Sequence, residues 1–296
     1  APVPTQRALI MTGIALIAIM ADRSPFSLRL VAIAAMLVLL FQPSSLMGVS
    51  FQLSFAAVTA LIAFYEANRA SILGFRRSGT AWSRFLTWVL GIALTSVIAT
   101  LGTAPFTLYH FQQFAAYSLI GNILAMPVMV FWVMPSAVLT FLSWPLGLQD
   151  YALHLMGEGI SWITYFAKVT SDLPGAVWRV PQWPPYLLVL MSLGGLWLCL
   201  VKGRERHLGW AGLALAFILS FTVNPADIRV SENAKLVAAR LPDNGELVFS
   251  SRRAERFTRD VWARQNGQDK DGAALLDEGN QYFQCDFMGC LGTVNT

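Results

Sequence analysis

The stretch FQPSSLMGVSFQLSFAAVTALI, Phe41–Ile62, decides how this chain folds. A polar turn, Gln42–Ser45, separates two apolar runs, and the second run is long enough to cross a bilayer. Gln52 and Ser54 lie inside that second run. A polar side chain in hydrocarbon is unfavourable unless it contacts a partner, another helix or a hydrated path. The pattern favours either hydrogen bonding between helices or a functional role in a polar path.

The amino-acid composition is that of a polytopic membrane protein. The 296 residues are 55% hydrophobic and 13% charged, with a mean hydropathy of +0.54, whereas a soluble domain carries about 25% charged residues. We predict an all-α polytopic membrane protein with about 6–8 membrane segments, some of them broken or re-entrant, and one amphipathic helix. A small α+β soluble tail is expected after it. Because the chain begins at Ala1 rather than Met, we interpret it as a fragment.

Charge and hydropathy both change near Asn224-Pro225. Residues 1–225 carry a net charge of +6, and residues 226–296 carry −2. We therefore predict a transmembrane domain over 1–225 and a soluble tail over 226–296. Basic loops face the cytoplasm, and if the loop Lys202–Arg206 is one of them, the tail lies outside the cytoplasm, in the periplasm or the extracellular space.

Hydropathy indicates a series of apolar segments that could cross the membrane. Their number between Thr103 and Pro185 stays open, because the segment after Ala115 contains Asn122, Pro127 and Pro135 and could be broken or re-entrant. The predicted segments are Ala8–Ala21, Leu28–Phe41, Met47–Tyr65, Phe85–Leu101, Ala115–Leu142, Tyr186–Val201 and Leu208–Val223.

The segment Gln149–Lys168 has the helical spacing of an amphipathic helix. It is either a helix lying in the membrane interface or the wall of a hydrated passage. One face carries Asp150, His154, Glu158, Ser161, Tyr165 and Lys168, and the other carries Leu153, Met156, Ile160, Ile163 and Ala167.

A cluster of polar side chains, His110, Gln112 and Gln113, ends the segment Thr103–Gln113. Pro105 is expected to interrupt the helix there. The histidine has no second His or carboxylate at metal-ligand spacing, so we predict no metal site.

The tail reads as a small α+β module. We predict strands at Ile228–Val230, Lys235–Ala239 and Glu246–Phe249, with a turn at Pro242–Gly245. Ser250 or Ser251 is expected to cap a helix over Arg252–Arg264, anchored by Phe257 and Trp262. Cys285 and Cys290 either form a disulfide outside the cytoplasm or remain as two thiols.

Four stretches, taken in order, resemble the ComEC competence-protein family, whose members are transmembrane channels for DNA uptake. The resemblance spans about residues 5–223. Its pieces are Thr5–Ala8 with the apolar run that follows, Phe41–Leu53, which resembles the family's Asp-Pro…Gly-Phe-Gln-Leu-Ser-Phe motif, Pro105–Gln113 followed by Asn122 and Pro127, and Leu173-Pro174-Gly175.

The chain departs from the family in three ways. Gln42 stands where the family has an acidic residue, so no role carries over to that position. The family's soluble N-terminal domain would precede Ala1. Many members also have a C-terminal metallo-β-lactamase-like domain, but the chain's histidines, His110, His154 and His207, all precede the tail. The tail is therefore expected to be a short, reduced one without that metal motif.

The resemblance implies an inner-membrane channel for single-stranded DNA, working with a cytoplasmic ATP-driven motor and a periplasmic DNA receptor. We expect no enzyme activity and no cofactor, and the sequence has no nucleotide-binding Gly-x-x-x-x-Gly-Lys-Ser/Thr loop. A secondary transporter of a small solute and a nonfunctional competence-protein relic are the alternatives. The residues expected to line or gate the DNA path are Arg7, Gln52, Ser54, His110, Gln112, Gln113 and Asn122.

Overall fold

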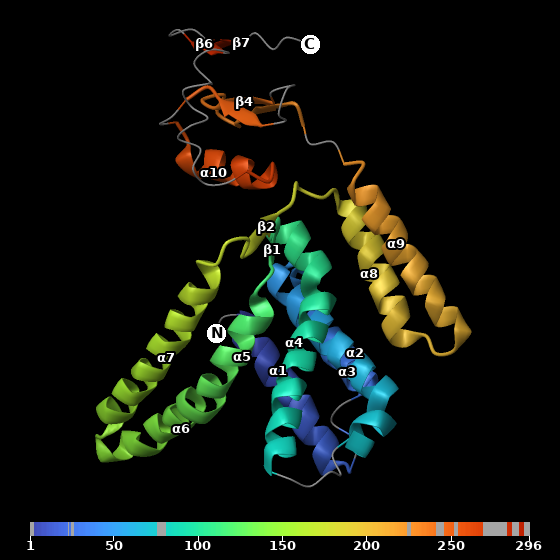
Figure 1. The fold of residues 1–296 in the computed structure, drawn as a ribbon, viewed down its shortest axis with the longest axis vertical. Coiled ribbons are helices and arrows are strands. Elements are labelled where there is room, and N and C mark those ends of the chain that lie inside the picture. Colours follow the sequence, from blue (N-terminus) through green and yellow to red (C-terminus); the bar gives the residue numbers. More distant parts are fainter. Residues whose placement is uncertain are drawn as a thin grey trace. The chain divides into compact units, whose positions relative to one another are not determined.

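The structure is a computed structural model that describes residues 3–22, 24, 27–75, 81–223, 226–240, 246–251, 254–268, 283–285 and 290–292. These residues are mostly helical and end in a small tail that contains strands (Figure 1). Three helical segments of the described part are long and apolar enough to cross a membrane: Val49–Arg69, Arg84–Phe111 and Ser118–Ser143. Shorter apolar helices cover Ala8–Met20, Leu28–Phe41 and Pro185–Leu200. The expected count of 6–8 membrane segments stays a prediction.

The chain divides into two compact units, which we describe separately. The first contains Ala1–Phe106, Ala115–Trp178 and Gly194–Trp210, and the second contains Thr107–Phe114, Arg179–Leu193 and Ala211–Thr296. The predicted domain boundary at Asn224-Pro225 lies outside the described residues and stays a prediction.

In the first unit, Phe41–Ile62 forms a corner between two helices. Helix α2 (Leu28–Phe41) ends before Gln42, the 3₁₀-helix η1 (Pro43–Met47) follows, and α3 (Val49–Phe75) begins after Gly48. Pro43 suits the first turn of η1 because its missing N–H would have no partner there. The corner closes over a core of Ala34, Val38, Phe51 and Phe55, which also packs against Ile10, Met11 and Ile14 of α1 (Val3–Met20).

Helix α4 (Ala81–Phe111) corrects the expectation for Pro105. The proline lies inside the helix, which continues to Phe111. An apolar helix tolerates proline when local adjustments satisfy the freed backbone groups. Small residues bring α3 and α4 together, since a Cβ added at Gly102 would lie 2.6 Å from the Cβ of Ala60.

The first unit also contains a helical hairpin (Figure 1). Its first arm comprises α5 (Ser118–Val128), the π-helix η2 (Met129–Val133) and α6 (Met134–Ser143). The 3₁₀-helix η3 (Trp144–Leu146) leads to the second arm, α7 (Gln149–Ser171). The interruption expected from Asn122, Pro127 and Pro135 takes the form of the π-helix, and a π-helix inside an α-helix is often found at a functional position.

The two arms pack through small residues. A Cβ added at Gly159 would lie 2.8 Å from Cγ2 of Val133 and 3.0 Å from Cδ1 of Trp132. The indole N–H of Trp132 donates to the Leu155 carbonyl oxygen at 2.9 Å. Close backbone approach at small residues is the usual way that helices associate in lipid.

Short strands and the remaining helices complete the described chain. The strands β1 (Gln113–Ala115) and β2 (Val177–Arg179) form a two-stranded sheet. Helices α8 (Pro185–Leu200) and α9 (Leu208–Ser220) flank the 3₁₀-helix η4 (Arg204–His207). In the second unit, Trp183, Leu187, Met191 and Ala216 form a buried cluster.

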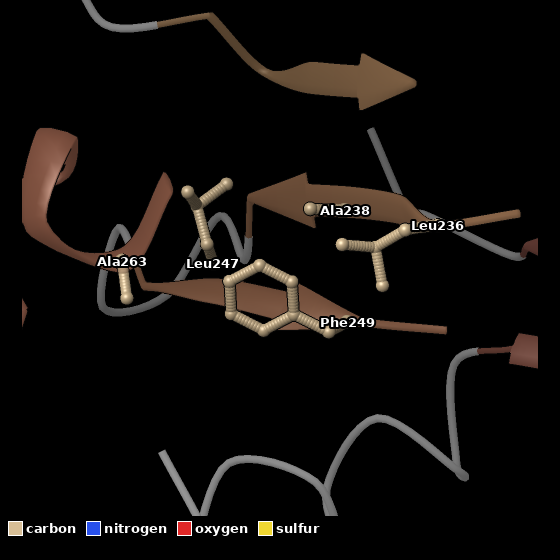
Figure 2. Packing of buried hydrophobic residues seen from close by; sticks show 5 residues of the cluster. All are labelled: Leu236, Ala238, Leu247, Phe249 and Ala263. Carbon is tan, nitrogen blue, oxygen red and sulfur yellow. The ribbon is translucent and has the colours of Figure 1, made fainter. Parts of the chain in front are cut away.

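The tail, in the second unit, contains an antiparallel sheet of β3 (Ile228–Val230), β4 (Val237–Arg240) and β5 (Leu247–Phe249). Helix α10 (Arg256–Gln265) packs on one face of this sheet. Figure 2 shows the buried residues between them: Leu236, Ala238, Leu247, Phe249 and Ala263. The expected mixture of strands and a helix is therefore present.

Several details of the predicted tail helix are wrong. Helix α10 begins at Arg256, and neither Ser250 nor Ser251 caps it. Ser250 Oγ instead accepts a hydrogen bond from the Val237 N–H at 3.0 Å, next to the sheet. Phe257 is 79% exposed because it lies five residues before Trp262, on a different side of the helix. Trp262 does pack on the core, as expected.

The last described strands, β6 (Phe283–Cys285) and β7 (Cys290–Gly292), pair antiparallel, with Cys285 and Cys290 as direct Cα partners. The predicted turn Pro242–Gly245 lies outside the described residues.

Candidate functional site

Gln52 and Ser54 lie on the first two turns of α3, directly after the corner. Gln52 Nε2 donates to the Leu46 carbonyl oxygen of η1 at 3.0 Å. This hydrogen bond links the start of α3 to the 3₁₀-helix before it. Both side chains are half-buried. Residues two apart on an α-helix point about 200° apart. Gln52 and Ser54 therefore face nearly opposite sides of α3 and cannot both line one narrow path.

His110, Gln112 and Gln113 lie in the second unit, where α4 ends. Gln112 has a left-handed backbone, with φ +53, and its N–H donates to the Leu108 carbonyl oxygen at 3.1 Å. Its side chain donates to the Tyr109 carbonyl oxygen at 2.7 Å. Gln112 thus caps the helix and turns the chain into β1. His110 makes an edge-to-face contact with Tyr109 at 5.0 Å between ring centroids, and Gln113 is exposed in β1.

In the first unit, the Leu-Pro-Gly motif forms a tight turn beside the start of α5. Gly175 has φ +75, and the Ala176 N–H donates to the Leu173 carbonyl oxygen at 3.1 Å. Proline followed by a glycine with positive φ is the sequence of a type II turn. Tyr117, directly before α5, donates its hydroxyl to the Pro174 carbonyl oxygen at 3.2 Å. The Leu-Pro-Gly turn is therefore in direct contact with the residue that precedes α5.

The predicted polar face of α7 is exposed along its whole length, from Asp150 through His154 and Glu158 to Lys168. The opposite packing face is made by Ala152, Met156, Gly159 and Ile163, which are buried or half-buried. Leu153, Ile160 and Ala167, expected to share this apolar face, are exposed.

The predicted path residues are divided between the two units. Gln52, Ser54 and Asn122 belong to the first unit, and His110, Gln112 and Gln113 belong to the second. Asn122 is half-buried in α5. The backbone of Arg7 lies in α1, but its side chain lies outside the described part. Their role in a path stays a prediction. Among the described residues, no group of three or more His, Cys, Asp or Glu side chains is placed to hold a metal ion.

Sequence reasoning missed the contacts of Tyr117 and Trp132, both of which join segments far apart in the chain. The packing face of α7 did leave a signal. Ala152, Met156, Gly159, Ile163, Phe166 and Thr170 alternate spacings of four and three residues, which is the heptad pattern of helix pairs.

The apolar helices of the described part, three of which are long enough to cross a membrane, indicate a helical membrane protein. Residues 1–205 match the family described as Competence protein, and the chain belongs to that family. It is 28% identical over 189 residues to ComE operon protein 3 of Bacillus subtilis (strain 168). The alignment covers 63% of this chain and 23% of that relative, so the chain spans under a quarter of the relative's length. No solved structure matches the chain. These matches support a role in competence.

Proposed function

We propose that the chain forms part of an inner-membrane channel through which single-stranded DNA enters the cytoplasm during natural transformation. The observation that carries the proposal is the match of residues 1–205 to the Competence protein family. This range contains the three long apolar helical segments Val49–Arg69, Arg84–Phe111 and Ser118–Ser143. A role in competence and a membrane location together point to the step at which DNA crosses the membrane.

The chemistry of the strand sets what the channel needs. A polyanion does not enter hydrocarbon, so its path is hydrated and lined by donors. Gln52 and Asn122 carry amide donors and are half-buried in apolar helices of one unit. We propose that these two side chains contact the strand. A cytoplasmic ATP-driven motor supplies the energy, a periplasmic receptor delivers the strand, and the tail is periplasmic.

The test is uptake of labelled DNA into the cytoplasm, with and without the full-length gene in the parent organism. Deletion is expected to abolish cytoplasmic label while surface-bound DNA remains, and re-expression is expected to restore entry. An unrelated membrane protein expressed in its place serves as the control. Unchanged entry in the deletion strain would contradict the proposal and leave transport of a small solute as the alternative.

A further inference from the structure

Two neighbouring arginines on the tail sheet have no ion-pair partner among the described residues. Arg229 lies in β3 and Arg240 ends β4. The Arg240 N–H donates to the Asp227 carbonyl oxygen at 2.8 Å, so Arg240 stands opposite Asp227. Arg229 follows Asp227 by two residues and therefore shares its face of the sheet. This is the face that packs on α10 (Figure 2).

Three arginines converge where α10 ends, all within the second unit. Arg229 Nη1 donates to the side-chain oxygen of Gln265, and Arg240 Nη2 donates to that of Asn266. Arg179 Nη1 donates to the Gln268 carbonyl oxygen at 3.0 Å. In these three bonds the acceptors are neutral amide oxygens. A neutral oxygen satisfies an N–H group without neutralising a charge, so the bonds of Arg229 and Arg240 leave both positive charges in place.

The positive charge of Arg229 and Arg240 is larger than the partial negative charge at the C-terminal end of α10. Burial, and next the positive charge of Arg240, lower the pKa of Arg229 from its ordinary value. A helix C-terminus contributes only about half a negative charge. The carboxylate of Asp227, opposite Arg240 on the same face, adds one more, and the sum is still less than the charge of Arg229 and Arg240 together.

The cluster also contains buried polar atoms without a hydrogen-bond partner. Two buried donors, Arg240 Nε and Gln268 Nε2, have no hydrogen-bond partner, and neither has the buried acceptor Gln268 Oε1. A buried donor without an acceptor is costly, so the two donors point to an acceptor that the described residues do not provide.

We propose that Arg179, Arg229 and Arg240 form a binding site for a phosphate group of a single-stranded nucleic acid. A guanidinium matches the oxygens of a phosphate with two parallel N–H groups, which a lysine cannot do. The three side chains are half-buried rather than enclosed, so a strand reaches them from solvent. The choice of nucleic acid over another phosphate rests on the proposed function.

The first test measures fluorescence anisotropy of labelled oligo(dT) with the full chain in maltoside micelles. The double variant Arg229→Gln, Arg240→Gln is expected to weaken binding at least about tenfold, because hydrogen bonds to charged groups contribute about 1.5–3 kcal/mol each. Arg256→Gln is the matched control, since it removes the same charge from the exposed start of α10 and is expected to leave binding unchanged. Equal affinity of the double variant and the wild type would overturn the site.

A second test uses the wild-type chain, so it does not depend on how the variant folds. Phenylglyoxal modifies arginine side chains, and peptide mass spectrometry reports each position. Oligo(dT) is expected to slow modification of Arg229 and Arg240 but not of Arg256. Equal rates with and without oligo(dT) would overturn the site, as would protection by phosphatidylglycerol alone, which would assign the cluster to lipid headgroups.

The two experiments distinguish a failure of the phosphate site from a failure of the proposed channel function. Normal DNA uptake after gene deletion, together with protected arginines, would leave the phosphate site standing and remove the channel. Lost uptake after deletion, together with unprotected arginines, would leave the channel and remove the site.

Discussion

The hydroxyl of Tyr117 donates a hydrogen bond to the carbonyl oxygen of Pro174, 3.2 Å away and 57 residues further along the chain. A second bond lies beside it, from the Ala116 N–H to the Ala176 carbonyl oxygen at 2.9 Å. The start of α5 is thereby tied to the turn after α7. The two arms of the hairpin are thus joined at their open end, and the Leu-Pro-Gly motif supplies the acceptor.

Replacing Tyr117 by Phe is expected to lower the free energy of unfolding by about 0.5–1.5 kcal/mol, because one net hydrogen bond is lost. The measurement is the denaturation of the purified chain in detergent, followed by intrinsic fluorescence. Tyr151→Phe is the control, because Tyr151 is 80% exposed on the same hairpin and is expected to have no effect. Equal losses in both variants would show that the bond to Pro174 does not stabilise the hairpin.

Two glycines on α7 give a matched pair for testing the hairpin packing. Gly159→Ala is expected to destabilise the protein by about 1–3 kcal/mol, because its Cβ would lie 2.8 Å from Cγ2 of Val133. Gly157→Ala meets nothing within 4 Å and is expected to be stabilising by up to about 1 kcal/mol through helix propensity. The measurement is the thermal unfolding of both variants and of the wild type in the same detergent. A stabilising Gly159→Ala would contradict the packing of α7 against Trp132 and Val133.

A second glycine pair tests the contact between α3 and α4. Gly102→Ala is expected to lower the thermal midpoint, since its Cβ would lie 2.6 Å from the Cβ of Ala60 and 3.3 Å from the Ala56 carbonyl oxygen. Gly91→Ala, in the same helix and with nothing within 4 Å, is expected to leave the midpoint unchanged or raise it. If both changes had the same effect, the close approach of the two helices would be wrong.

Asn122→Leu tests whether a polar residue of α5 serves transport or folding. We expect it to reduce DNA entry while its amount in the membrane stays normal, because an amide donor is removed from the path. Immunoblotting of membranes gives the amount, and labelled DNA gives entry. Loss of the protein from the membrane would instead assign Asn122 to helix–helix hydrogen bonding.

Gln52 and Ser54 provide an internal comparison, because they face nearly opposite sides of α3. We expect Gln52→Leu to reduce DNA entry at a normal membrane level and Ser54→Leu to leave entry unchanged. Equal reduction by both changes would contradict a narrow path along one face of α3.

The oxidation state of the two tail cysteines tests whether the tail is periplasmic. Cys285 and Cys290 are Cα partners on β6 and β7, and directly opposed residues of antiparallel strands have Cα separations of about 4.5–5.5 Å, which suits a disulfide. If the tail is periplasmic, we expect alkylation under denaturing, non-reducing conditions to modify Cys199 alone. Modification of all 3 cysteines would contradict an oxidised periplasmic pair.

Local patterns in the sequence predicted what depends on neighbouring residues. The turn Gln42–Ser45, the long apolar runs and the strand Ile228–Val230 follow from hydropathy and turn chemistry, and the structure contains each of them. The exposed polar side of α7 follows from its helical period.

Tertiary contacts decide the features that the sequence could not indicate. Pro105 stays inside α4, where the rule for soluble helices predicts an interruption. Phe257 is exposed because α10 turns Trp262 and Ala263 towards the sheet. The partners of Tyr117 and of the arginine cluster lie 57 to 89 residues away or on other elements, and no local pattern reports such contacts.

The central claim is that a DNA strand passes along polar side chains of the membrane helices. The most direct test places a photo-crosslinking amino acid at Asn122 and, as a control, at Phe141, which is apolar and 75% exposed on α6. Cells are illuminated while they import labelled DNA, and the chain is then isolated. We predict a DNA adduct at position 122 and none at position 141. Import that proceeds without an adduct at 122, or with equal adducts at both positions, would contradict the claim.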